Sequence, residues 1–213
     1  MWHKDNFYKI LLVFSIIVAA ISSCYLVIDQ LNSKKNKAGE GGTQSLNEYD
    51  IGGEFCLTNF DNQKFTNENL KGKISILYFG FSFCPDVCPE SLAKFVKIKN
   101  VLEKYAIDVN IVFITIDPKR DTAEVLKSYL GFFHKDFIGL TGTEKEIEEI
   151  SKKFKVYFAI APQDSQSDNE DYMLDHSSFS YVLNKNGDFI KVFYLKSSAE
   201  EMIEFILMQN KKY

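Results

Sequence analysis

Two continuous apolar runs, residues 74–81 and 109–116, constrain the fold of this chain most strongly. Both are rich in β-branched and aromatic residues and have the length of buried strands. Between them, residues 85–105 carry apolar side chains at helical spacing, as an amphipathic helix does. Because strands and helices alternate in this way, we predict a partly parallel sheet that is covered by helices on both faces.

The segments that follow extend the alternation into an α/β domain. Asp121, Thr143 and Ser198 each precede a glutamate by three residues, the spacing of a capping box, so we expect each of them to begin a helix. A terminal hairpin followed by a helix is the arrangement of a thioredoxin-like fold, which is the fold class that we expect. The further expected elements are a hairpin at 55–66, helices at 121–133, 143–154 and 198–209, a strand at 137–140 and a hairpin at 181–194 around Asn186-Gly187.

An uncharged run at residues 10–28 precedes this domain. As a helix with a rise of about 1.5 Å per residue it would span roughly 28 Å, close to the hydrocarbon thickness of a bilayer. The residues before Cys24 resemble a lipoprotein cleavage site, which leaves lipidation open, but the apolar run continues past Cys24 and favours an uncleaved anchor. We therefore predict a cytoplasmic tail at 1–9, a transmembrane helix at 10–28, a flexible linker at 29–50 and the domain at 51–213.

Charge and cysteine content narrow the function classes. The formal net charge of -4 gives no support for a nucleic-acid partner. The four cysteines are too few for a disulfide scaffold in a chain of 213 residues. Cys84 and Cys88 lie close together, which indicates metal or redox chemistry, whereas Cys56 in the first hairpin is expected to be an ordinary buried thiol.

Cys84 and Cys88 follow a predicted buried strand and precede or begin a predicted helix. They therefore lie at the carboxyl end of a strand in a parallel sheet, where ligands commonly bind. A helix N-terminus favours the thiolate, which is both the nucleophile and the metal ligand. Residues four apart on a helix have Cβ atoms about 5–6 Å apart, whereas a relaxed disulfide needs about 3.8 Å. The spacing thus favours a metal over a disulfide, but it leaves the disulfide open because Cys84 can lie just outside the regular helix.

Two thiolates need a third ligand, and the chain has three histidines. His3 precedes the apolar run, and His134 ends a predicted helix, where a surface cation suits the helix dipole. His176 lies in the segment just before the terminal hairpin. In a thioredoxin-like fold, that segment passes beside the loop that carries the cysteines. We therefore predict a metal site of Cys84, Cys88 and His176, a low-coordinate set that suits copper and especially Cu(I). The alternative is that His176 is a structural histidine.

Three segments resemble the Sco/SenC family in order and spacing, and the similarity runs from about residue 53 to the C-terminus. They are residues 84–89 (Cys-Pro-Asp-Val-Cys-Pro), 116–122 (Ile-Asp-Pro-Lys-Arg-Asp-Thr) and 175–177 (Asp-His-Ser). The resemblance implies that Cys84, Cys88 and His176 bind copper, as Cu(I) or Cu(II). It also implies a role in assembling the binuclear copper centre of cytochrome c oxidase. The expected partners are the copper-centre subunit of the oxidase and a copper donor protein.

Two function classes stay open: a copper metallochaperone, and a thiol–disulfide oxidoreductase that acts on cysteines of the oxidase subunit or of other periplasmic proteins. Thioredoxin-type enzymes place a cis-proline opposite a pair of cysteines separated by two residues. Here the separation is longer by one residue, and no proline lies between residue 163 and the C-terminus. These differences favour the metallochaperone, which is not an enzyme. The site chemistry predicts a single-pass protein of a bacterial inner membrane whose domain faces the periplasm.

Overall fold

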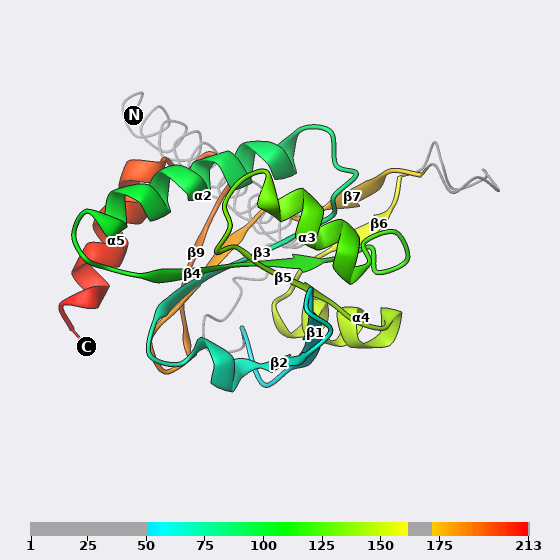
Figure 1. Cartoon of the computed structure of the whole chain (residues 1–213), viewed down its shortest axis with the longest axis horizontal. Helices are drawn as coiled ribbons and strands as arrows, with labels where there is room; N and C mark the ends of the chain where they lie inside the picture. The colour runs from blue at the N-terminus through cyan, green and yellow to red at the C-terminus, as the bar shows by residue number, and fades with distance from the viewer. Residues whose placement is uncertain (1–50, 162–171, 213) are drawn as a thin grey trace, which may run out of the picture. The chain divides into compact units, whose positions relative to one another are not determined.

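The computed structural model describes residues 51–161 and 172–212 of the chain (Figure 1). The predicted tail, transmembrane helix and linker, at 1–9, 10–28 and 29–50, lie outside the described residues. Among the residues that are described, no helix is both long enough and apolar enough to cross a membrane.

A seven-stranded sheet with the order β2-β1-β5-β4-β3-β8-β9 forms the centre of the domain (Figure 1). The three central strands β5, β4 and β3 are parallel. Strands β1 and β8 pair with them in antiparallel fashion, and β2 and β9 in turn pair in antiparallel fashion with β1 and β8. This mixed sheet confirms the pattern predicted from the apolar runs. The strands are β1 (Cys56–Asn59), β2 (Lys64–Thr66), β3 (Ile74–Gly80), β4 (Val109–Thr115), β5 (Ile138–Thr141), β8 (Ser180–Leu183) and β9 (Phe189–Phe193).

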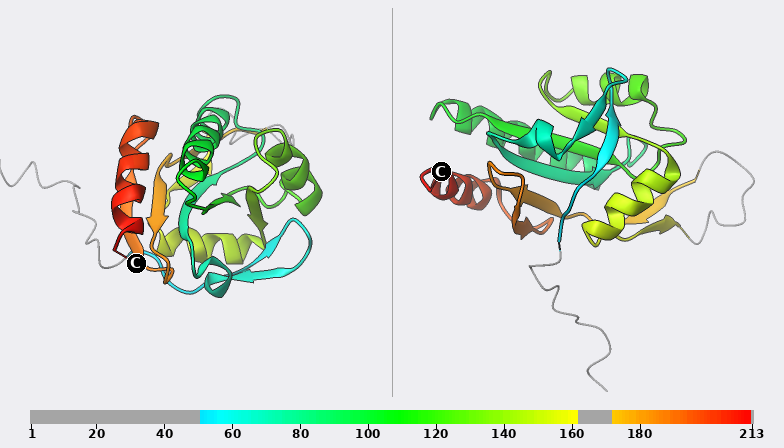
Figure 2. Two further views of the ribbon diagram at one scale, coloured as in Figure 1. Left: turned by 60° about the vertical axis from the view of Figure 1, so that its left-hand side comes forward. Right: turned by 90° about the horizontal axis from the view of Figure 1, so that it is seen from below.

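Helices cover both faces of this sheet (Figure 2). Neighbouring side chains of β3 point to opposite faces, so Tyr78 packs on Phe95 of one helix while Phe79 packs on Phe154, which ends another. The continuous apolar run of β3 is therefore buried on both sides. The helices are α2 (Val87–Glu103), α3 (Ala123–Gly131), α4 (Glu144–Lys153) and α5 (Ala199–Asn210), with a short 3-10 helix η2 (Asn67–Leu70), and α2 packs against α5.

Two of the three predicted helix caps are confirmed. Thr143 forms a capping box at α4, and the Ser198 hydroxyl accepts a hydrogen bond from the backbone N–H of Glu201 at α5. The prediction for Asp121 is wrong, because Thr122 caps α3. Asp121 is fully buried and turns its carboxylate inward, where tertiary partners replace the role of a cap.

A second, two-stranded sheet was not predicted. Strand β6 (Phe158–Ile160) pairs in antiparallel fashion with β7 (Leu174–His176), and Phe158 lies opposite His176. Three residues are too few to show a hydrophobic period, so the sequence carries no signal for these strands. The prediction that Cys56 is buried is also wrong. It is exposed, because side chains alternate along β1 and Leu57 is the residue that points into the core.

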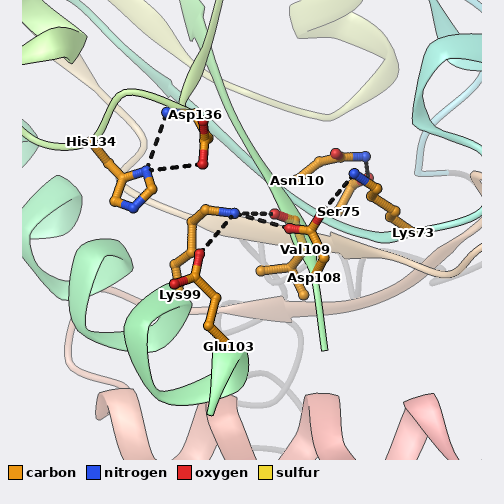
Figure 3. A network of polar contacts seen from close by, with 9 residues as sticks. All are labelled: Lys73, Ser75, Lys99, Glu103, Asp108, Val109, Asn110, His134 and Asp136. Carbon is orange, nitrogen blue, oxygen red and sulfur yellow. Dashed lines mark hydrogen bonds and ion pairs between the residues drawn. The ribbon is translucent and has the colours of Figure 1, made fainter. Parts of the chain in front are cut away.

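A buried ammonium group fixes the C-terminal half of α2 (Figure 3). Lys99 is 3% exposed, and its Nζ donates hydrogen bonds to Asp108 at 3.0 Å and to the Val109 carbonyl at 3.3 Å. The same Nζ lies 3.6 Å from a carboxylate oxygen of Glu103. Since a charge is buried only when it is paired, these contacts hold the end of α2 against the start of β4.

Candidate metal centre

Cys84, Cys88 and His176 converge at the carboxyl end of β3. Cys84 lies in the loop that leaves β3, and Cys88 lies in the first turn of α2. His176 ends β7, and its Nε2 is 3.7 Å from the Cys88 sulfur. The two sulfurs and one ring nitrogen all lie within 4.8 Å of one another. The structure therefore brings together the three residues chosen from the sequence, and we call them the thiol–imidazole group.

Gly80, the last residue of β3, makes room for the Cys88 sulfur. A Cβ atom at this position would lie 2.6 Å from that sulfur, 3.0 Å from the Tyr78 ring and 3.1 Å from the Phe113 ring. These distances are shorter than van der Waals contact, so any side chain at residue 80 would displace Cys88. This role was not predicted from the sequence, although a glycine in a buried strand is a signal for a close approach.

The two thiols differ in charge. A hydrogen bond from the Cys88 thiol is the main cause that lowers the pKa of Cys84 to about 4; burial opposes it, and His176 and the backbone N–H groups of Asp86 and Cys88 contribute in the same direction. The same hydrogen bond, together with burial and the nearby Cys84 charge, raises the pKa of Cys88. The expectation that the helix N-terminus favours a thiolate is met at Cys84 only. Since metal ligation needs both sulfurs deprotonated, binding of a metal releases the Cys88 proton.

The His176 ring is held from two sides. Its Nδ1 lies 3.2 Å from the backbone carbonyl of Ser177, and its ring meets the Phe81 ring edge-on with centroids 5.7 Å apart. When Nδ1 carries the proton and donates to this carbonyl, the lone pair of Nε2 faces the Cys88 sulfur. The ring is thus oriented as the imidazole of a metal ligand is.

A buried carboxylate braces the loop that carries Cys84. Asp121 accepts a hydrogen bond from the Ser82 backbone N–H at 3.0 Å and another from the Thr115 hydroxyl at 2.6 Å. The Ser82 hydroxyl donates to the same carboxylate. Burial raises the pKa of Asp121, and these donors oppose that effect. Asp121 therefore ties the loop to the end of β4, a role that its position in the sequence did not reveal.

Glu103, His134 and Asp136 form a second group whose possible ligand atoms lie within 4.8 Å of one another, and we call it the carboxylate–imidazole group (Figure 3). Its carboxylates are exposed, and Glu103 already pairs with Lys99. His134 Nδ1 accepts a hydrogen bond from the Asp136 backbone N–H at 3.2 Å. Because these donors are engaged and a cation stands beside them, the group is not a candidate metal centre.

The donor atoms of the thiol–imidazole group fit copper. Thiolate and imidazole ligands select soft or borderline ions such as Cu(I), whereas calcium and magnesium take oxygen ligands. Cys88 is fully buried and Cys84 is 8% exposed, so the sulfurs are shielded from solvent. A soft ion of low coordination number suits such a site.

Sequence comparison relates the whole domain to known proteins. The SCO1/SenC family model matches residues 43–209. A SCO2-like protein of Rickettsia conorii is 45% identical over 203 residues, which cover 95% of this chain and 97% of that protein. The mitochondrial protein SCO2 of Saccharomyces cerevisiae is 46% identical over 164 residues, which cover 76% of this chain and 54% of that protein.

Structural comparison gives the same result. The crystal structure of yeast Sco1 with copper bound matches with a TM-score of 0.70 at 41% identity, over 76% of this chain and 90% of that chain. The α/β, thioredoxin-like fold expected from the sequence is thereby confirmed, and so is the family resemblance. The chain belongs to the SCO1/SenC family.

Proposed function

We propose that this protein is a copper metallochaperone that binds one copper ion through Cys84, Cys88 and His176. The proposal rests on one observation, the convergence of two sulfurs and an imidazole nitrogen within 4.8 Å. Relatives whose structures contain bound copper support it. The function is to assist assembly of the binuclear copper centre of cytochrome c oxidase, and the Sco family is described as one of cytochrome c oxidase assembly proteins.

Each ligand has a distinct part in this proposal. Cys84 already carries a negative charge and is the less deeply buried of the two cysteines, so it is the residue that meets an incoming ion first. Cys88 releases its proton as it ligates, which makes binding depend on pH. His176 supplies a neutral nitrogen through Nε2 and closes the set of ligands. For Cu(I), two thiolates and one imidazole leave no need for a further group.

Copper analysis of the full-length chain in detergent tests the proposal. We expect one copper per wild-type chain, and for His176→Ala a weaker affinity in competition with a Cu(I) chelator at an unchanged melting temperature. Cys84→Ser and Cys88→Ser should lose copper. Full-strength binding of one copper by the His176 variant would contradict the three-ligand site. Zinc bound in preference to copper in cells would contradict the choice of metal.

The proposed setting is a bacterial inner membrane, with residues 10–28 as the anchor and the domain in the periplasm. The uncharged length of this run and the thiol chemistry of the site support it. The proposed partners are the copper-centre subunit of the oxidase and a copper donor. A C-terminal alkaline phosphatase fusion should be active, and an inactive fusion beside an active cytoplasmic reporter would contradict this orientation.

A thiol–disulfide oxidoreductase is the second candidate, and the contrast between the two thiols favours it. A thiolate at Cys84 can attack a disulfide of a target, and the Cys88 thiol can then resolve the mixed disulfide. Cys84 and Cys88 would give up two electrons and the one Cys88 proton and become a disulfide, while the two sulfurs of the target would become thiols by taking that proton and a second one from solvent. Reduction of insulin at rates typical of thioredoxin would favour this candidate over the metallochaperone.

A further inference from the structure

We propose that Arg120 is a positioning residue that holds His176 against the two cysteines, an inference that rests on the proposed copper site. The guanidinium carbon of Arg120 lies 3.8 Å from the centre of the Tyr172 ring and 4.8 Å from the centre of the Phe83 ring. Both distances are within the range of about 6 Å in which a cation is attracted to an aromatic face.

The two rings belong to the two segments that carry the ligands. Phe83 directly precedes Cys84 in the loop after β3, and Tyr172 stands just before β7, which ends in His176. One side chain therefore contacts both the cysteine side and the histidine side of the site. We call Arg120, Tyr172 and Phe83 the arginine clamp.

Asp117 holds the clamp in place by hydrogen bonds to two of its members. Its carboxylate accepts a hydrogen bond from Arg120 Nε at 2.5 Å and another from the Tyr172 hydroxyl at 2.7 Å. Asp117 is buried, and its own backbone N–H donates to the Thr115 hydroxyl at the end of β4. Through Asp117 the position of the guanidinium is thus tied to the central sheet.

The histidine side of the site needs such a clamp more than the cysteine side does. Cys88 lies in α2, and the cysteine loop leaves β3, which is hydrogen-bonded on both of its edges. His176 lies in β7, a strand of three residues whose ladder partner is β6, in a sheet separate from the central one. A two-stranded sheet is marginal by itself, so contacts outside the ladder must hold His176 in register with the sulfurs.

Arginine suits this position because its charged group is planar and carries several hydrogen-bond donors. Its planar guanidinium can stack on a ring and donate to a carboxylate at the same time, whereas the ammonium group of lysine is a point charge. Arg120→Lys keeps the charge and removes the stacking. Because the ligands stay in place, the loss should resemble that of a partner outside the ligand set, about 10- to 100-fold in copper affinity.

A double-mutant cycle tests whether Arg120 acts through His176. Copper affinity is measured by competition with a Cu(I) chelator for the full chain in detergent, as wild type, Arg120→Lys, His176→Ala and the double variant. We expect Arg120→Lys to weaken binding about 10- to 100-fold when His176 is present and to have almost no effect when it is absent. A residue that only stabilised the fold would weaken binding equally in both backgrounds.

Two further variants keep the test decisive. Tyr172→Leu retains Arg120 and removes its stacking partner, so it should reproduce the loss even if Arg120→Lys fails to fold. Lys119→Met is the matched control, because Lys119 is the neighbouring cation and pairs at the surface with Glu144. It should bind copper as the wild type does.

The outcomes separate the clamp from the copper site itself. Wild-type affinity in both Arg120→Lys and Tyr172→Leu, or an equal loss with and without His176, would overturn the clamp and leave the copper site standing. A wild-type chain that bound no copper would overturn both. The Cu(II) complex adds a spectroscopic check, since Arg120→Lys should weaken the nitrogen-ligand signature in electron paramagnetic resonance.

Discussion

Helix α2 carries a possible metal ligand near each of its ends. In both groups the ligand atoms lie close together, but the groups differ in burial, in donor type and in neighbouring charge. At its start Cys88 faces Cys84 and His176, where the sulfurs are buried and one thiol is charged. At its end Glu103 faces His134 and Asp136, where the carboxylates are exposed. The first group consists of soft donors, and the second consists mainly of oxygens beside the ammonium of Lys99.

The comparison shows that convergence of ligand types does not by itself define a metal site. Both groups place their atoms within 4.8 Å. In the thiol–imidazole group the neighbouring residues leave the sulfurs room and orient the ring toward them, as Gly80 and Ser177 do. In the carboxylate–imidazole group, neighbouring residues already occupy the ligand atoms. Lys99 pairs with the Glu103 carboxylate, and the Asp136 backbone N–H donates to His134 Nδ1. The surroundings decide which group can take an ion.

The largest effect should come from Gly80→Ala, which affects the thiol–imidazole group and the rings packed beside it but not the carboxylate–imidazole group. The added methyl would meet the Cys88 sulfur at 2.6 Å, so the sulfur must shift. We expect copper affinity to fall at least about tenfold, and the free energy of unfolding to fall by about 1–3 kcal/mol, as overpacked cores do. Gly131→Ala is the control, because the added methyl would meet no atom within 4 Å outside its chain neighbours and the backbone of its own helix. Equal behaviour of the two variants would show that Gly80 has no special role.

The charge of Cys84 provides the next test. The pKa of Cys84 is lowered to about 4, so its thiolate persists through mildly acidic pH, and alkylation by iodoacetamide should continue until the pH falls to about that value. Cys88→Ala removes the main hydrogen bond to this thiolate, so the midpoint should rise toward the ordinary thiol pKa of about 8.5. Mass spectrometry of the Cys84 peptide between about pH 2.5 and pH 9 measures the midpoint. An unchanged midpoint in Cys88→Ala would contradict the assignment, and Glu103→Gln should not move it.

Lys99→Met should affect the opposite end of α2 and leave copper binding unchanged. It removes the charged hydrogen bonds to Asp108 and the Val109 carbonyl, but Asp108 is half exposed and regains water. We expect the free energy of unfolding to fall by about 1 kcal/mol, measured by urea denaturation. Lys97→Met, on the same helix but with an exposed ion pair, should leave stability almost unchanged. An equal loss in both variants would mean that burial of Lys99 adds nothing.

The smallest effect should come from the carboxylate–imidazole group itself. A variant with Glu103→Gln, His134→Asn and Asp136→Asn should retain the copper stoichiometry of the wild type and an affinity within about twofold, as a distant and independent group does. Elemental analysis after loading with copper or zinc checks this. Loss of one metal equivalent per chain would show that the group is a site after all.

The parts of the fold that follow local chemistry were predictable. The apolar runs became β3 and β4 because strands buried on both faces need apolar side chains at nearly every position. Thr143 and Ser198 cap their helices because a cap depends only on residues within one turn. The choice of Cys84, Cys88 and His176 also came from spacing and chemistry, and the structure places them together.

What the sequence could not determine depends on contacts between distant segments. Asp121 has the spacing of a helix cap, yet it bonds Ser82, 39 residues away, because the ends of β3 and β4 are adjacent in the sheet. Cys88 stays protonated although it begins a helix, because Cys84 and burial outweigh the dipole. The sequence by itself determined the apolar strands at the centre of the sheet, two of the helix caps and the three residues of the thiol–imidazole group. Only the tertiary structure decided which polar groups are paired, which thiol is charged and where the Cys88 sulfur has space. These properties depend on distances between segments that are far apart in the sequence, and no local pattern encodes them.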